Sequence, residues 1–262
     1  AGVLLRIIMP VHPGTLIKNE AAGVTYRQRF TPAQTNLLFL STGEYTVPPG
    51  AHSGRLSLKS EEALLWMWKG AATVNIDGVD YDLAHYDTLY VPKGAEFRIS
   101  NASADAPAVL WQTSATADHV HPVYHAKFAE VFENEARIRR LKGKNVYLMF
   151  DVSEPADKLI AGYTFFEPHA RSWPPHNHTD QEEVYIFIQG QGSMEVYENE
   201  ENLSFVHSVK EGDMVTIPFL NYHPVFSQAE PLHFIWCIAG ERYWVGDKNK
   251  QFMQGTADKI TT

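Results

Sequence analysis

The chain has 262 residues, of which 44% are apolar and 12% aromatic, and its formal net charge is −9. This length can hold one large or two medium domains, and the apolar content suffices for a packed core. The negative charge argues against a nucleic-acid partner, which needs clustered Lys and Arg, but it permits a small anionic substrate in a pocket with its own local charge.

Cysteine usage and hydropathy bear on the compartment of the protein. The only cysteine, Cys237, lies in an apolar run and cannot form an internal disulfide, which fits a reducing compartment. We interpret it as a small buried hydrophobic residue. No apolar run approaches the length that crosses a bilayer, and residues 3–8 lack the pattern of a signal peptide. We therefore expect a cytoplasmic protein with no membrane partner.

The elements predicted in the first half are short strands joined by turns. Fifteen Pro and seventeen Gly, with many Val, Tyr, Phe and Thr, favour strands over helices. We expect an apolar strand over 63–68 after the pair Glu61-Glu62, an alternating strand over 71–76, a hairpin turn at Asp77-Gly78 and a strand over 87–92. Short strands at regular spacing predict an all-β protein.

The second half repeats this order of elements. The pair Glu182-Glu183 opens an apolar run over 184–188 that reaches Gly190, and the strand expected over 213–218 ends in Pro as the one over 87–92 does. A charge-rich stretch between the two copies predicts a linker with a short helix and a solvated face. We expect a first domain over 1–127, a linker over 128–142 and a second domain over 143–262.

Four candidate metal ligands stand in the second half: His176, His178, Glu183 and His223. Two His at positions i and i+2 of a strand point to the same side. A divalent metal of borderline softness accepts imidazole nitrogen and carboxylate oxygen together, and an incomplete protein shell leaves positions open to water or substrate.

The first copy lacks this set. Counting back from Glu62 by the offsets that relate Glu183 to its two His reaches Arg55 and Ser57, and counting five residues on from Pro92 reaches Phe97. Arg and Phe cannot complete a metal shell. We therefore expect one divalent metal ion per chain, bound in the second half, and a structural first half.

The ligand spacing resembles the two motifs of the cupin superfamily. The first motif corresponds here to His176, His178, Glu183 and Gly190, and the second to Gly212, Pro218 and His223. The chain departs from the family at Ala170 and Leu220, where a Gly is usual. The resemblance implies a bicupin, that is, two double-stranded β-helix (jelly-roll) barrels in which neighbouring strands bring the ligands to one point.

Within this superfamily, the second half is similar to the 5-deoxy-glucuronate isomerases of myo-inositol catabolism. The similarity lies in 171–178, which contains Pro-Pro-His, and in 182–185, 222–225 and 239–240. This similarity covers most of 40–245. The related 4-deoxy-5-hexosulose-uronate isomerases share the metal motif, and their activity is the alternative. The resemblance implies a metal-dependent conversion of 5-deoxy-glucuronate to 5-dehydro-2-deoxy-gluconate. Zinc is the expected ion, with manganese and iron as alternatives.

Three further residues are candidates for this chemistry. Moving a carbonyl to the next carbon requires removal of a proton and stabilisation of an enediolate, which a divalent ion and a nearby acid–base group can provide. By strand alternation Tyr185 shares the inward face of Glu183, and His233 is a second acid–base candidate if its strand faces inward. Arg171 is a candidate for binding the substrate carboxylate. For each of them, barrel packing or a surface position is the competing interpretation.

Two other classes of function stay open. An iron-dependent dioxygenase uses the same ligand set and would consume oxygen. A non-enzymatic sugar-binding bicupin would bind a sugar acid without turnover. The sequence leaves open the exact sugar acid and the oligomeric state, a homo-oligomer included. His119, His121 and His125 have ligand-like spacing but no carboxylate at a motif position, so we interpret them as residues of an interdomain loop.

Overall fold

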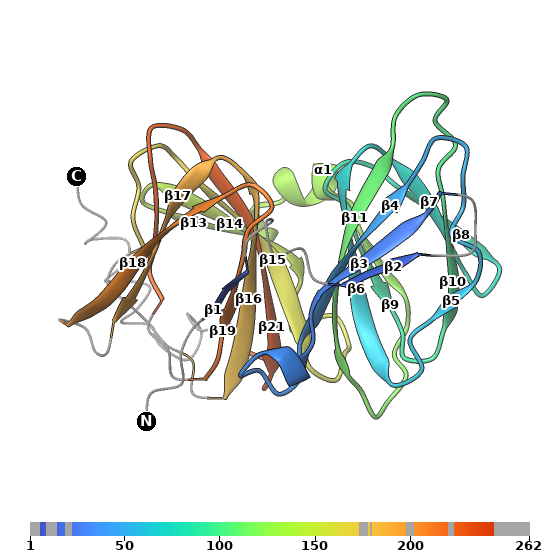
Figure 1. Cartoon of the computed structure of the whole chain (residues 1–262), viewed down its shortest axis with the longest axis horizontal. Helices are drawn as coiled ribbons and strands as arrows, with labels where there is room; N and C mark the ends of the chain where they lie inside the picture. Colours follow the sequence, from blue (N-terminus) through green and yellow to red (C-terminus); the bar gives the residue numbers. More distant parts are fainter. Residues whose placement is uncertain are drawn as a thin grey trace.

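The computed structural model describes residues 6–8, 15–18, 23–172, 178, 180–197, 202–219 and 223–243. Two strand-built barrels lie side by side (Figure 1). The helices of the described part are short: the α-helix α1 (Phe128–Phe132) and 3-10 turns at Pro32–Gln34 and Glu135–Arg137. The all-β prediction is confirmed, as is the short helix expected between the halves.

In the described part of the chain, the first barrel consists of eleven strands in two sheets. They are β2 (Thr15–Lys18), β3 (Thr25–Phe30), β4 (Ser41–Val47), β5 (Leu56–Ser57), β6 (Glu61–Lys69), β7 (Ala72–Ile76), β8 (Val79–Leu83), β9 (Thr88–Val91), β10 (Glu96–Ser100), β11 (Ala108–Thr116) and β12 (Tyr124–Ala126). The seven-stranded sheet has the order β12-β9-β6-β11-β4-β3-β2, and the four-stranded sheet has the order β5-β10-β7-β8.

The second barrel repeats this arrangement, with ten strands among the residues that the structure describes. They are β1 (Arg6–Ile8), β13 (Ile138–Leu141), β14 (Lys144–Phe150), β15 (Leu159–Phe166), β16 (Gln181–Gln189), β17 (Gln191–Tyr197), β18 (Leu203–Lys210), β19 (Met214–Ile217), β20 (Val225–Ser227) and β21 (Leu232–Gly240). The large sheet has the order β1-β19-β16-β21-β15-β14-β13, and β18-β17-β20 forms the small one.

Two strands bear on the division of the chain. The N-terminal strand β1 pairs with β19 of the second barrel. Strand β13 lies within the predicted linker, yet it pairs with β14 and so belongs to the sheet of the second barrel. The domain limits at 127 and 142 stay a prediction, because strand pairing alone does not delimit a folding unit.

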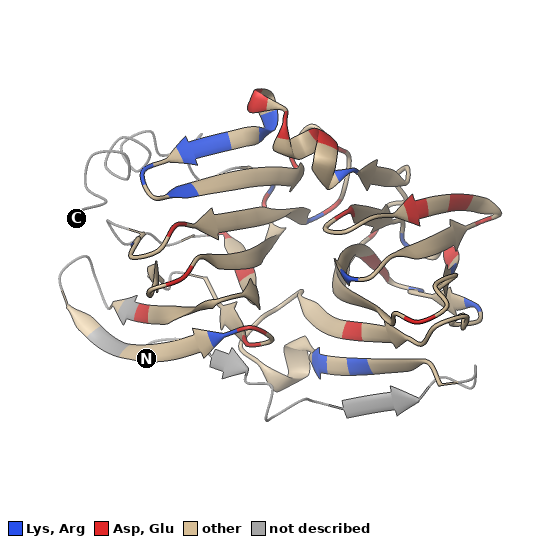
Figure 2. Cartoon of the chain, turned by 90° about the horizontal axis from the view of Figure 1, so that it is seen from above, with Lys and Arg blue, Asp and Glu red and all other residues tan. Residues whose placement is uncertain are grey.

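Within the described residues no helix is long and apolar enough to cross a membrane. Lys and Arg occur in both barrels with Asp and Glu among them (Figure 2).

The apolar runs of the central strands are buried on both faces. On β6, Leu65 packs inside the first barrel, while Trp66 packs in a layer between the barrels. On β16, Phe187 packs inside the second barrel and Ile186 in the same shared layer. Burial on both faces explains why these strands read as continuous apolar runs rather than alternating ones. Cys237 is fully buried in the shared layer, as expected.

The strand register corrects how the two copies align. Ala63 pairs with Val91, which precedes Pro92, and Glu183 pairs with Ile217, which precedes Pro218. Ala63 is therefore the counterpart of Glu183, and Glu62 is the counterpart of Glu182. The alignment of Glu62 with Glu183 was wrong by one residue, and on a strand a slip of one residue moves a side chain to the opposite face.

Glu62 and Glu182 make equivalent contacts across the junction of the barrels. The Glu182 carboxylate accepts hydrogen bonds from the backbone N–H groups of 38–40 at 2.6 to 2.7 Å. The Glu62 carboxylate accepts from the backbone N–H groups of 157–159 at 2.7 to 3.2 Å and from the Tyr90 hydroxyl at 2.6 Å. Each barrel thus holds the backbone of the other where an equivalent strand begins, β4 or β15.

Glu182→Ala should lower the free energy of unfolding by about 3 kcal/mol, because it removes a charged acceptor from three amide groups near the core. Denaturation in urea measures this change. Glu96→Ala is the control, since Glu96 is exposed and its ion pair with Arg55 spans 3.8 Å. Equal effects of the two substitutions would show that the interbarrel contacts contribute little to stability.

Candidate metal centre

Three of the four predicted ligands meet inside the second barrel. The Glu183 Oε1 atom lies 3.2 Å from His223 Nε2 and 3.7 Å from His178 Nε2. The two imidazole rings are nearly parallel, with centroids 5.4 Å apart. All three side chains are buried, and their ligand atoms lie within 4.8 Å of one another. The fourth predicted ligand, His176, lies outside the described residues.

Gln181 sets the orientation of His178. The amide nitrogen of Gln181 donates to the carbonyl oxygens of Glu241 and Tyr243 at 2.7 and 2.8 Å, so its oxygen faces His178 Nδ1 at 2.7 Å. His178 Nδ1 must then carry the proton, which leaves a lone pair on Nε2 beside Glu183. Sequence analysis missed Gln181, although its place two residues before Glu183 on the same strand face was a signal.

The chemistry of this donor set fits a divalent cation. Burial lowers the pKa of His178 although the Glu183 carboxylate opposes the shift, so this imidazole is neutral near pH 7. Glu183 Oε1 is buried and accepts no hydrogen bond from any residue that the structure describes. A buried carboxylate oxygen facing neutral imidazole nitrogen is the arrangement that an ion of the zinc type requires.

Tyr185 lies beside this centre, on the inward face that strand alternation predicted. Its ring makes an edge-on contact with His223, with centroids 5.7 Å apart. Burial, with the adjacent Glu183 carboxylate, raises the pKa of Tyr185 well above its usual value. The hydroxyl therefore stays protonated at neutral pH and can act as a hydrogen-bond donor.

The structure places Arg171 in an existing ion pair. Its Nη2 atom lies 2.6 Å from Glu195 Oε2 and 2.6 Å from the Tyr197 hydroxyl. A substrate carboxylate would have to compete with Glu195 for this guanidinium group. The predicted role of Arg171 in substrate binding stays a prediction and has no added support.

His233 does not meet the condition for a catalytic role. Its ring stacks on Phe165, with centroids 3.7 Å apart and planes 12° apart. Phe234 and Trp236 fill the inside of the barrel, and alternation along β21 sends His233 to the other face. Burial lowers the pKa of His233 to about 4. We therefore remove His233 from the catalytic candidates.

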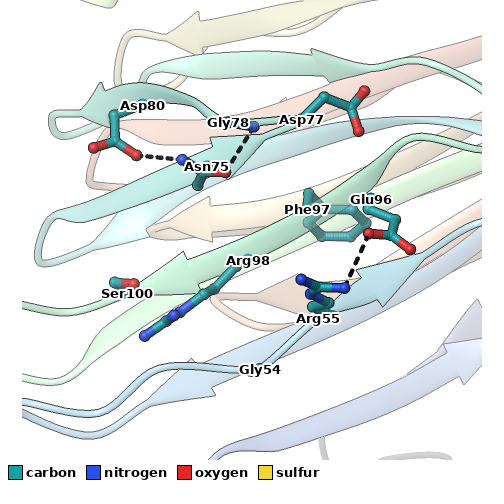
Figure 3. A pocket seen from close by; sticks show the side chains of 10 residues that line it. All are labelled: Gly54, Arg55, Asn75, Asp77, Gly78, Asp80, Glu96, Phe97, Arg98 and Ser100. Atoms are coloured by element: carbon teal, nitrogen blue, oxygen red, sulfur yellow. Dashed lines mark hydrogen bonds and ion pairs between the residues drawn. The ribbon is translucent and has the colours of Figure 1, made fainter.

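The first barrel has apolar residues at the matching positions. Ala63 is the counterpart of Glu183, so the counterparts of the two His are Leu56 and Leu58. They are not Arg55 and Ser57, as the sequence alignment predicted. Both leucines pack against the core of the first barrel. Phe97 belongs to the same core, and Arg55 pairs with Glu96 at its edge (Figure 3). Among the described residues, no cluster of potential metal ligands lies inside the first barrel.

The solved structures that resemble this one support the bicupin fold. An IolB-like protein from Salmonella typhimurium LT2 superposes with a TM-score of 0.70 at 19% identity, covering 93% of this chain and 95% of that one. A deletion mutant of Bacillus subtilis oxalate decarboxylase superposes with a TM-score of 0.69 at 17% identity, covering 88% and 76%. At these identities the likeness shows the fold alone. The protein is a bicupin.

Sequence comparisons assign the chain to one family. The model of the KduI/IolB family matches residues 15–254, and the chain belongs to this family. The 4-deoxy-L-threo-5-hexosulose-uronate ketol-isomerase of Bacillus pumilus is 28% identical over 196 residues, which cover 68% of this chain and 66% of the relative. The match thus spans just under two thirds of that relative's length.

His223→Ala should abolish zinc binding at the barrel centre, and Gln181→Leu should weaken it roughly 10- to 100-fold, because loss of the Gln181 oxygen frees the His178 ring to turn. Competition with a chromophoric chelator measures both affinities. His207→Ala is the control, since His207 is exposed on β18 and its Nδ1 atom lies 2.8 Å from the carbonyl oxygen of the adjacent Ser208. Unchanged affinity in His223→Ala would refute the assignment of the ligands.

Proposed function

We propose that this protein is a metal-dependent aldose–ketose isomerase of a deoxy sugar acid. The observation that carries the proposal is the convergence of His178, Glu183 and His223 on one buried point in the second barrel. Membership of the KduI/IolB family supports it, because the curated relatives that match are named ketol-isomerases. His176 is proposed as the fourth ligand from the sequence motif, and zinc as the ion, with manganese or iron as alternatives.

Two substrates are candidates. The resemblance of 171–178 and 222–225 to the 5-deoxy-glucuronate isomerases favours 5-deoxy-glucuronate, which would become 5-dehydro-2-deoxy-gluconate in inositol catabolism. The names of the matching relatives favour 4-deoxy-L-threo-5-hexosulose-uronate. Both are uronate-type sugars with a carbonyl beside a hydroxyl carbon, so the same reaction type serves either.

The residues around the centre have separable roles. When bound, a divalent ion would polarise the carbonyl and stabilise the negative charge of an enediolate. His178, held by Gln181, presents a neutral nitrogen atom, and His223 presents its Nε2 atom beside the Glu183 carboxylate, which supplies the negative charge of the ligand set. The protonated Tyr185 hydroxyl is the group that can donate a proton to a substrate oxygen. The apolar side chains that line the barrel interior exclude competing water.

Incubation of the metal-loaded protein with each uronate under nitrogen tests the proposal. We expect the aldose and ketose forms to interconvert without a nicotinamide cofactor. In heavy water, deuterium should appear beside the new carbonyl when the transferred proton exchanges with solvent. Treatment with a chelator should abolish turnover. Nuclear magnetic resonance of the products reads out each of these. Oxygen uptake with cleavage of a substrate would instead indicate a dioxygenase, and binding without turnover would indicate a sugar-binding bicupin.

Tyr185→Phe should lower kcat by roughly 100-fold with unchanged metal content, because it removes the proposed proton donor but no ligand. Tyr163→Phe is the matched control: Tyr163 is also buried, but its hydroxyl donates to the carbonyl of Tyr86 in the layer between the barrels. Near-normal kcat in Tyr185→Phe would indicate that Tyr185 serves only in packing.

A further inference from the structure

A second group of ligand-type side chains meets at the junction of the two halves. His119 and His121 follow β11 of the first barrel, and Asp157 precedes β15 of the second. Asp157 Oδ1 lies 3.2 Å from His119 Nδ1 and 2.7 Å from His121 Nε2. Two imidazole nitrogens from one half thus point at a single carboxylate oxygen from the other.

The backbone holds Asp157 in this position. Its Oδ2 atom accepts hydrogen bonds from the N–H groups of Asp118 and His119 at 2.5 and 3.1 Å, which directs Oδ1 toward the imidazoles. Burial opposes ionisation, but the hydrogen bonds from His121 and these two amides outweigh it and lower the pKa of Asp157. A fixed, ionised carboxylate whose second oxygen is hydrogen bonded is typical of metal ligands.

The group is also accessible to an ion. The His121 side chain is 22% exposed and that of His119 is 77% exposed, so an ion can enter and retain water as a further ligand. The ligand atoms of Glu62, His121 and Asp157 lie within 4.8 Å of one another, and the exposed His119 approaches this cluster through its Nδ1 atom, 3.2 Å from Asp157 Oδ1. The two Glu62 oxygens already accept four hydrogen bonds, so we do not count Glu62 as a ligand.

We propose that His119, His121 and Asp157 form a second binding site for a divalent transition metal of the zinc type, which links the two halves of the chain. Two imidazole nitrogens and one carboxylate oxygen are a common ligand set for such ions. The site adds to the single ion predicted from the sequence motifs. The spacing of His119 and His121 was visible in the sequence, but the carboxylate that completes the set stands 36 residues after His121.

The role that follows from this geometry is structural. The ion would bridge the loop after β11 and the loop before β15, next to the Glu62 contacts that already join the barrels. An ion that binds only the folded chain stabilises it. The proposal concerns binding and stability, and it does not depend on the isomerase activity.

The test uses the full chain carrying His178→Ala and His223→Ala, so that the barrel centre no longer competes for metal. Equilibrium dialysis against zinc should find one ion per chain, and saturating zinc should raise Tm by roughly 5 °C. Adding His121→Ala should abolish both effects, as should Asp157→Asn. Adding His207→Ala, which removes an exposed His elsewhere, should leave them unchanged.

Two results would overturn the proposal. One is the absence of bound zinc in the chain with the barrel ligands removed, which would leave the group as a hydrogen-bonded cluster. The other is zinc binding that persists after His121→Ala. Because Asp157 also anchors the amides of Asp118 and His119, its substitution can loosen the loop, whereas His121→Ala removes a ligand without touching those bonds.

Discussion

The structure depends on the contact between its two barrels. A layer of buried aromatic and aliphatic side chains fills the space between the large sheets, with Trp66 and Tyr163 in edge-on contact at 5.3 Å. Within it, the carboxylates of Glu62 and Glu182 each bind the backbone of the opposite barrel. A buried carboxylate is costly unless donors satisfy it, so these groups specify one mutual position of the barrels as well as stabilise it.

This contact also determines where the metal ligands lie. On β16, alternation sends Glu182 outward to the backbone of the first barrel and its neighbour Glu183 inward to His178 and His223. The strand that supplies the central carboxylate of the site is thus anchored by the first barrel, which holds no such cluster among the residues that the structure describes. The first barrel has Ala63 at the matching position, and its backbone at 38–40 binds Glu182 of this strand.

The sequence predicted the fold class and the duplication, because both follow from short strands and turns that recur in the same order. It also singled out His178, Glu183 and His223, which the structure brings together, while the proposed fourth ligand His176 stays a prediction. Prediction from the sequence failed where a shift of one residue, or a partner distant in the chain, determines the contacts of a side chain. The alignment of Glu62 was wrong because two adjacent Glu begin each run, and only strand register distinguishes them. The face of His233 and the pairing of His121 with Asp157 depend on tertiary contacts that no local pattern encodes.

The central claim is that an ion held by His178, Glu183 and His223 defines the working site of this bicupin. A crystal of the protein loaded with one equivalent of zinc, measured at the zinc absorption edge, tests it most directly. The account predicts an anomalous difference peak between these three side chains inside the second barrel. No peak there, in a crystal that binds zinc elsewhere, would contradict it.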